Sequence, residues 1–289
     1  KKILFRGCGT AIATPFTNEN KINYEVLKKY LDFQIENKVD AIIVCGTTGE
    51  SATLSNDEKK ELINFTVKYV NKKVPVIAGT GSNNTKSAIE ISRYAEKVGA
   101  DGLLVVTPYY NKTTQEGLIE HYIEIARKVK IPIIMYNVPS RTGVNILPET
   151  CLELSKIENI VAIKEASGNI SQIAKIAQLC RDNLYIYSGN DDQILPILSI
   201  GGIGVISVLS NIKPKEVHDI CEKCINGNID NAKEIFLKFL PLANSLFCEV
   251  NPIPIKYALS KIGYDFGKPR LPLVELKNKE LIDSQIEML

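Results

Sequence analysis

The sequence predicts a (β/α)8 barrel followed by a small C-terminal helical region, and three observations carry that prediction. Eight short apolar runs alternate with segments of helical period through residues 1–227. Successive runs are about 28 residues apart, which is the length of one βα unit. The chain has 289 residues, and a single α/β barrel takes about 250. We therefore expect residues 1–227 to form the barrel and residues 228–289 the helical region.

The apolar runs are rich in Val and Ile and show little polar alternation, as parallel strands buried on both faces do. The eight expected strands are residues 9–16, 39–45, 74–79, 102–107, 131–137, 160–165, 184–188 and 204–208.

The helices between these strands are marked by capping residues. Asn23 can cap a helix over residues 24–37, and Ser55 with Glu58 forms a capping box. Gly99 is a C-cap signal for the helix over residues 84–98. The other expected helices are residues 55–70, 114–129, 148–155, 169–179, 194–199 and 214–224.

A doubly wound open sheet is the rival fold, and it usually carries a glycine-rich phosphate loop after its first strand. Residues 13–18 read ATPFTN, and the chain has no GxGxxG or GxxxxGK[ST] motif. The barrel is therefore favoured. In the C-terminal region, residues 251–254 read NPIP and predict a rigid break between helices, with Pro252 a candidate cis-proline.

Charge and cysteine content narrow the functional classes. Lys plus Arg is 35 and Asp plus Glu is 33, a balance that does not favour a nucleic-acid binder or a polybasic membrane anchor. The uncharged residues 193–212 contain Pro196 and three glycines, so they predict a buried helix, a turn and a strand rather than a membrane span.

The seven cysteines are odd in number, and no signal-peptide pattern opens the chain, so we expect reduced thiols and a cytoplasmic protein. Cys221 and Cys224 form a lone CxxC in a chain with two histidines, and no metal site is expected.

Function in such a barrel lies at the C-terminal ends of the strands. After the second strand, two glycines flank Thr47 and Thr48, which predicts a tight turn whose N–H groups and hydroxyls suit a carboxylate or phosphate. A plain βα turn is the alternative. After the fifth strand, Tyr136 can shuttle protons and Arg141 can bind a carboxylate. The alternative is that the tyrosine packs in the core and the arginine lies on the surface.

Lys164 follows three apolar residues in the sixth strand. Alternation places it on one face with Ala162, and Glu165 on the other face with Ile163. An ammonium is costly to bury, and the neutral amine attacks carbonyl carbons. A lysine that reaches water or pairs with a carboxylate is the alternative.

The remaining strand ends offer weaker signals. Tyr109 and Tyr110 should point in opposite directions, so that one can face the barrel mouth, although aromatic pairs more often pack. Gly189 could let a ligand approach the backbone. Asp191 and Asp192 are expected to cap the next helix. Together the mouth holds a lysine, a tyrosine and an arginine, which favours Schiff-base chemistry on a keto acid.

Several motifs resemble those of the dihydrodipicolinate synthase family, within the pyruvate-dependent N-acetylneuraminate lyase superfamily. The resemblance covers essentially the whole chain. The matching motifs are GTTGES (46–51), TPYYNK (107–112), YNVPSRT (136–142), KEASG (164–168) and NPIPIK (251–256).

The resemblance implies condensation of pyruvate with L-aspartate 4-semialdehyde, the entry step of diaminopimelate and lysine synthesis, with no cofactor. It implies that Lys164 forms an imine with pyruvate and that Tyr136 moves protons. It also implies that Thr48 and Tyr110 complete a hydroxyl relay, with Tyr110 supplied across a dimer interface of a homotetramer.

The resemblance further implies binding roles. The backbone around Thr47 and Thr48 would hold the pyruvate carboxylate, and Arg141 the carboxylate of the semialdehyde. The residues that line the site would be Gly189 and Ile206.

Two alternatives stay open. One is another lyase of the superfamily, such as N-acetylneuraminate lyase or a keto-deoxy sugar acid aldolase. The other is a non-catalytic barrel that binds a ligand.

A final expectation concerns regulation, because lysine-sensitive members of the family bind lysine near Tyr109 and Asn83 and place histidines and a carboxylate around it. Ala52 matches those members. The positions at which they place histidines and a carboxylate hold Asn56, Lys59 and Ser87 in this chain. We therefore expect weak sensitivity to lysine, or none.

Overall fold

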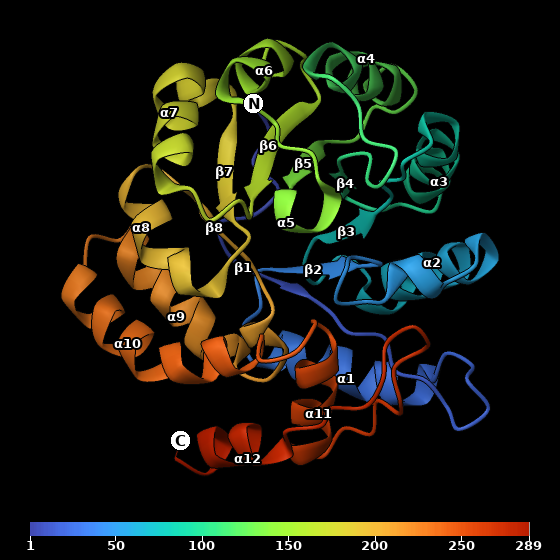
Figure 1. Cartoon of the computed structure of the whole chain (residues 1–289), viewed down its shortest axis with the longest axis vertical. Helices are drawn as coiled ribbons and strands as arrows, with labels where there is room; N and C mark the ends of the chain where they lie inside the picture. The colour runs from blue at the N-terminus through green and yellow to red at the C-terminus, as the bar shows by residue number, and fades with distance from the viewer. Residues whose placement is uncertain (289) are drawn as a thin grey trace.

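The computed structural model describes residues 1–288 and shows eight parallel strands in a closed barrel. Each strand pairs with the next, and β8 pairs with β1 to close the ring (Figure 1). The predicted fold class is therefore confirmed. The strands are β1 (Gly7–Ala11), β2 (Ala41–Val44), β3 (Val76–Gly79), β4 (Gly102–Val106), β5 (Ile133–Asn137), β6 (Ile160–Glu165), β7 (Tyr185–Ser188) and β8 (Gly204–Ser207).

Helices surround the strands, as Figure 1 shows. The barrel helices are α1 (Tyr24–Glu36), α2 (Asn56–Val70), α3 (Thr85–Lys97), α4 (Gln115–Ala126), α5 (Pro139–Thr142), α6 (Pro148–Leu154), α7 (Ile170–Cys180), α8 (Ile194–Ser199) and α9 (Pro214–Ile225). The short α5 was not predicted. It follows β5 directly and carries Arg141 at the barrel mouth.

The predicted caps are present. The Asn23 side chain accepts a hydrogen bond from the N–H of Val26, and Ser55 and Glu58 exchange both bonds of a capping box. Each cap satisfies backbone donors that a helix start leaves unpaired. Gly99 follows α3 with φ of +94°, a conformation that glycine adopts without steric cost.

The first strand differs from its predicted bounds, residues 9–16, because it begins earlier and ends at Ala11. After Ala11 the ladder does not continue, because the N–H of Ala13 donates to the side-chain oxygen of Asn211 and Pro15 has no N–H to donate. Phe16 instead forms an isolated antiparallel bridge with Ile22.

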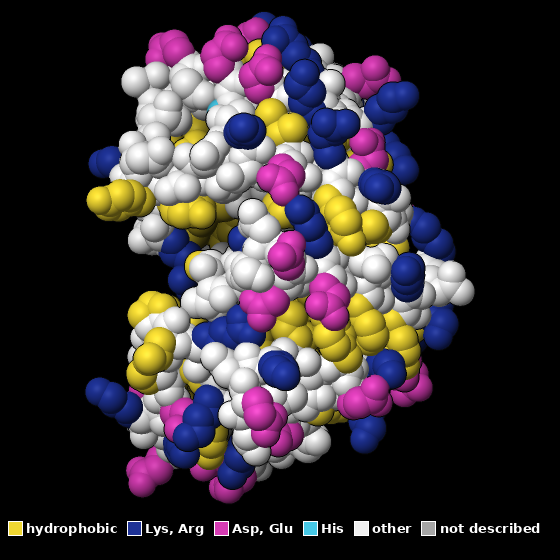
Figure 2. Space-filling model, turned by 90° about the vertical axis from the view of Figure 1, so that its right-hand side faces the viewer, with side chains coloured by type: hydrophobic (Ala, Val, Ile, Leu, Met, Phe, Trp, Pro, Cys, Tyr) yellow, Lys and Arg dark blue, Asp and Glu magenta, His cyan; other side chains and the backbone are white. Residues whose placement is uncertain are grey.

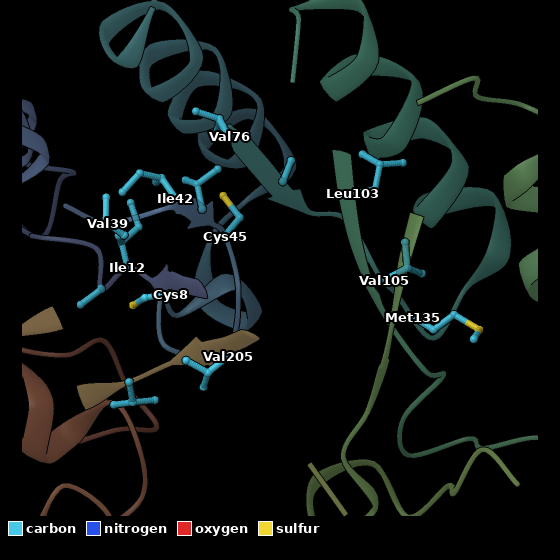
Figure 3. Close-up of a cluster of buried hydrophobic side chains, with 14 of the residues drawn as sticks. Cys8, Ile12, Val39, Ile42, Cys45, Val76, Leu103, Val105, Met135 and Val205 are labelled. Carbon is cyan, nitrogen blue, oxygen red and sulfur yellow. The ribbon is translucent and has the colours of Figure 1, made fainter. Parts of the chain in front are cut away.

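Apolar side chains fill two layers. On β4, Leu103 and Val105 point outward to the helices, and Leu104 points into the barrel. Figure 3 shows part of the outer layer, with Cys8, Ile42 and other strand residues between the strands and the surrounding helices. This alternation buries both faces of every strand, which explains the apolar runs.

The C-terminal region forms α10 (Ile229–Ser245), α11 (Ile253–Lys261) and α12 (Lys279–Glu287). These helices lie beside α9 and α1 at the lower part of Figure 1. The peptide bond between Asn251 and Pro252 is cis. Phe239 and Leu259 belong to the same buried cluster as the outer layer of the barrel. A division at residue 227 into two domains stays a prediction.

Residues 193–212 form α8, a turn and β8, as the sequence predicts. Among residues 1–288, no helix has the length and apolar character needed to cross a membrane. Figure 2 shows lysine and arginine side chains interspersed with acidic ones over one face of the molecule, in keeping with the balanced charge.

Candidate active site

A cavity of about 180 Å³ opens at the C-terminal ends of the strands. It is lined by side chains from the loops after β2, β5, β6, β7 and β8 and from the segment between α10 and α11. The lining residues are Thr47, Thr48, Tyr136, Val138, Ser140, Arg141, Lys164, Ala166, Gly189, Asn190, Val208, Phe247 and Asn251. Six of the eight residues predicted for the site therefore meet in one cavity.

Lys164 and Tyr136 are neighbours across the β5–β6 pair. The Lys164 ammonium lies 4.2 Å from the centre of the Tyr136 ring, and the lysine side chain is buried. Within residues 1–288, no carboxylate lies within ion-pair distance of this ammonium. Lys164 therefore lies in the cavity wall beside the Tyr136 ring, where its amine can meet a bound carbonyl compound.

The predicted alternation along β6 is confirmed. Ala162 belongs to the cluster inside the barrel, whereas Ile163 belongs to the outer layer. Glu165 is also on the outer side, where its carboxylate accepts hydrogen bonds from Asn137 and from the N–H of Ser167. Burial raises the pKa of Glu165 despite these bonds. Glu165 therefore supports the strand from outside the cavity.

The loop after β2 forms the predicted tight turn. The N–H of Gly49 donates to the carbonyl of Gly46, and the N–H of Glu50 donates to that of Thr47. In the described residues, the N–H groups of Thr47 and Thr48 donate to no backbone carbonyl. Two free N–H groups beside a buried hydroxyl form a site that suits a carboxylate.

Asn251 is a lining residue that sequence reasoning missed. Its side-chain amide donates to the Thr48 hydroxyl at 3.0 Å, and its carbonyl accepts from the Arg141 guanidinium at 3.4 Å. Its amide oxygen is buried and has no hydrogen-bond partner among residues 1–288. Asn251 thus connects two sides of the cavity. An asparagine directly before the rigid Pro-Ile-Pro segment was the sequence signal that could have singled it out.

The expected helix-capping role of Asp191 is wrong. The side chain of Asp191 is buried, and its carboxylate accepts hydrogen bonds from the Ser207 hydroxyl and from the N–H groups of Val208 and Leu209. It therefore ties the end of β7 to the loop after β8 rather than capping its own helix. Burial raises the pKa of this carboxyl, and the hydrogen bonds oppose that effect.

Gly189 lines the cavity, and its lack of a side chain lets its backbone pack closely against the loop after β6. A Cβ at this position would lie 2.6 Å from the Ala166 Cβ and 3.0 Å from the carbonyl oxygen of Glu165.

The two remaining predicted residues do not line the cavity. Ile206 belongs to the cluster beneath it, with Tyr136, and Val208 takes its place in the lining.

Tyr110 is 90% exposed, with φ of +69°, and it too lies outside the cavity lining of the single chain. A non-glycine residue in this conformation is strained. Its exposed ring is available to a second chain.

A closed (β/α)8 barrel with a polar cavity at the carboxyl ends of its strands defines the protein as a barrel enzyme. The chain belongs to the Dihydrodipicolinate synthetase family, whose model matches residues 4–286.

Relatives agree over nearly the whole chain. The 4-hydroxy-tetrahydrodipicolinate synthase of Caldicellulosiruptor saccharolyticus is 60% identical over 281 residues, which cover 96% of this chain and 95% of that protein. The crystal structure of dihydrodipicolinate synthase from Thermotoga maritima has a TM-score of 0.96 at 44% identity and covers 99% of both chains. The synthase from Cyanidioschyzon merolae with lysine bound has a TM-score of 0.96 at 40% identity, covering 99% of this chain and 98% of that one.

Proposed function

We propose that this enzyme condenses pyruvate with L-aspartate 4-semialdehyde to form 4-hydroxy-tetrahydrodipicolinate, the first committed step of diaminopimelate and lysine synthesis. The observation that carries the proposal is the buried Lys164 ammonium beside the Tyr136 ring, without a carboxylate partner in the described chain. The names of the relatives at about 60% identity support the same reaction.

In the proposed reaction, the Lys164 amine adds to the keto carbon of pyruvate, and loss of water gives an imine. The imine withdraws electrons, so the pyruvate methyl group can lose a proton and become an enamine carbon. That carbon attacks the aldehyde of the second substrate. The substrate's own amine then adds to the imine carbon, closes the ring and releases Lys164. One water leaves in the whole sequence, and no metal or external cofactor takes part.

The neighbouring side chains have proposed roles in binding and proton transfer. The free N–H groups of Thr47 and Thr48 hold the pyruvate carboxylate, and Gly189 lines the cavity in which it binds. Tyr136 moves protons at the imine, because its ring lies against the Lys164 ammonium. The Thr48 hydroxyl continues this relay.

Arg141 is the proposed ligand of the semialdehyde carboxylate, and it reaches the cavity from α5. A charged bidentate hydrogen bond contributes about 1.5–3 kcal/mol, or roughly tenfold to more than a hundredfold in affinity. A sugar-acid aldolase would bind hydroxyls at this place and would not need a guanidinium.

We also propose that the protein acts as a homo-oligomer, a tetramer of tight dimers, in which Tyr110 enters the relay of a second chain. Its exposed and strained position supports this role. A cytoplasmic location is supported by the seven cysteines, which are all free thiols.

A turnover assay tests the function. Purified enzyme with pyruvate and aspartate semialdehyde should form product, and N-acetylneuraminate should not be cleaved. Arg141→Ala should lower kcat/KM for the semialdehyde by at least tenfold while leaving the pyruvate imine. Turnover of the sugar acid without turnover of the semialdehyde would contradict the proposal. As a control, Arg127 lies on the surface paired with Glu124, and Arg127→Ala should change nothing.

A further inference from the structure

The last two cross-strand pairs of β5 and β6 lie at the barrel mouth. Tyr136 faces Lys164 in the register of these strands, and the next pair is Asn137 and Glu165. Successive side chains of a strand point to opposite faces. Tyr136 and Lys164 therefore share the inner face and meet in the cavity, whereas Asn137 and Glu165 share the outer face, where both are fully buried.

The outer pair is joined by hydrogen bonds. The amide nitrogen of Asn137 lies 3.1 Å from each carboxylate oxygen of Glu165. The same nitrogen donates to the side-chain oxygen of Asn145 at 2.9 Å, and the amide of Gln172 donates to the Glu165 carboxylate at 3.3 Å. Asn145 and Gln172 also bond to each other in both directions. These four side chains therefore form one network on the outer side of the catalytic pair.

Two backbone groups fix the direction of the bonds in this network. The N–H of Ile146 donates to the side-chain oxygen of Asn137 at 3.0 Å, so the amide nitrogen of Asn137 must face Glu165. The N–H of Ser167 donates to the Glu165 carboxylate at 2.9 Å, so this side chain must present an oxygen there. A side-chain amide can turn over, but a backbone N–H can only donate. Asn137 is therefore the donor of the pair, and Glu165 is the acceptor.

The backbone of these two strands does not by itself hold one register. The register shifts between Ile133 and Ile134, where β5 begins. A slip by one residue moves every side chain of a strand to its other face. At the barrel mouth, such a slip would turn Glu165 into the cavity and Lys164 out of it. The side-chain bonds of the outer pair oppose that slip.

The buried carboxylate of the outer pair is costly. Burial raises the pKa of Glu165, although every hydrogen bond described above favours its charged form. Apolar side chains would fill the same space without this cost, but they would define the pairing of the strands less strictly. A hydrogen-bonded polar pair in a protein interior can specify the register of the elements that carry it.

We propose that Asn137 and Glu165 are positioning residues, which hold Tyr136 and Lys164 in the arrangement that imine formation requires. Neither residue lines the cavity, so both act through the strands that carry them. The outer pair fixes the register, and the register places the Lys164 ammonium 4.2 Å from the centre of the Tyr136 ring. The inference rests on the proposed reaction of Lys164 with pyruvate.

An exchange of the two side chains tests the proposal. Glu165→Gln keeps the shape of the side chain but introduces an NH2 group that meets the NH2 groups of Asn137 and Gln172. Asn137→Asp places two carboxylates side by side. In the combined variant, the amides of Asn145 and Gln172 can turn over, and every side-chain bond can then form in the opposite direction. The N–H groups of Ile146 and Ser167 still meet oxygens.

The expected results are rates. Each single variant should lower kcat and the rate of imine formation at Lys164 by about tenfold or more, because small displacements of reacting groups are costly. KM for pyruvate should change less than about threefold, since the turn that carries Thr47 and Thr48 is untouched. The combined variant should return to within about threefold of the wild-type rates. Imine formation is followed by borohydride trapping at timed intervals and mass spectrometry, well below the Tm of each variant.

Two further variants separate positioning from stability. Gln172→Met removes one donor to Glu165 from a partly exposed side chain, and it should slow imine formation about threefold without loss of the fold. Asp101→Asn is the control. Asp101 directly precedes β4, at the opposite end of the barrel, and accepts a bond from the N–H of Val76 at 2.9 Å. This variant should lower Tm and leave kcat and imine formation unchanged.

The positioning role is overturned if Glu165→Gln and Gln172→Met form the imine at the wild-type rate. It is also overturned if the combined variant folds but stays as slow as the single variants. Absence of an adduct on Lys164 in the wild type would overturn the proposed reaction as well, so the two failures are distinguishable.

Discussion

Lys256 and Glu50 form an ion pair that is closed to solvent. The Lys256 ammonium lies 2.8 Å from the Glu50 carboxylate, and the two side chains are 2% and 0% exposed. Glu50 ends the turn that carries Thr47 and Thr48, and Lys256 lies on α11, some 206 residues later. The other carboxylate oxygen of Glu50 accepts from the N–H of Arg270. The C-terminal region therefore fixes the back of the proposed pyruvate-binding turn.

The first prediction follows from this pair. Lys256→Met leaves a buried carboxylate without its partner, which should lower the free energy of unfolding by about 3–5 kcal/mol. Because the turn loosens, KM for pyruvate should rise about tenfold, and kcat should change less. Denaturant unfolding and initial rates measure the two effects. Lys261 forms an exposed pair with Asp283, so Lys261→Met is the control and should cost less than about 1 kcal/mol. An unchanged KM in a destabilised Lys256→Met would limit the pair to a structural role.

The sequence predicts the barrel well because each strand is buried on both faces and must therefore be apolar throughout. This requirement produces the eight continuous apolar runs in the sequence. Lys164 stands out for the same reason, as a charge inside an apolar strand. The Asn251 contact with Thr48 joins residues 203 positions apart, and no local pattern reports such a contact. Asp191 shows a similar limit, since its partners belong to the loop after another strand.

The second prediction concerns Tyr110, whose ring is 90% exposed in the single chain. If the ring completes the relay of a partner, an inactive Lys164→Ala chain and a Tyr110→Phe chain should restore each other in part. Mixed dimers would then contain one intact site, and activity should rise above that of either variant alone. Subunit exchange is followed in parallel by mass spectrometry. Exchange without recovered activity would place the relay within one chain.

The third prediction is weak sensitivity to lysine, or none. Asn56, Lys59 and Ser87 line one small cavity, so a lysine ligand there would meet a like charge and no carboxylate. Two unit charges about 4 Å apart repel by about 4 kcal/mol at an effective dielectric of 20, before screening by salt. Half of that energy would weaken binding by more than tenfold. Initial rates at sub-saturating pyruvate should change little or not at all with millimolar lysine. Strong inhibition below about 1 mM would refute the expectation.

The fourth prediction concerns the two histidines, which should change the stability of the fold with pH in opposite directions. Burial lowers the pKa of His121 to about 4. The unfolded chain binds more protons than the folded chain between pH 4 and 6.5, so stability rises with pH across that window. The Asp40 carboxylate, 2.8 Å away, raises the pKa of His218 above 6.5, with help from Glu222 and Asp219. Its contribution is complete below pH 6.5 and is lost as pH rises through the folded pKa.

Denaturant unfolding across pH 4–9 measures both effects. His218→Asn should remove the loss of stability above pH 6.5 and leave the rise below it. His121→Asn should do the reverse, since the His121 ring is buried and contacts Thr85 rather than a carboxylate. Identical pH profiles for His218→Asn and the wild type would contradict the assignment to the Asp40 pair.

The central claim is that Lys164 forms the imine with pyruvate, and chemical trapping tests it most directly. Two lysines are buried in the described chain, Lys164 and Lys256, and Lys256 is held by Glu50. The enzyme is incubated with pyruvate and borohydride, digested, and mapped by mass spectrometry. A reduced pyruvate adduct on Lys164, lost in Lys164→Ala and retained in Lys261→Met, is the predicted result. An adduct on Lys256 or on any other lysine, or no adduct at all, would contradict the account.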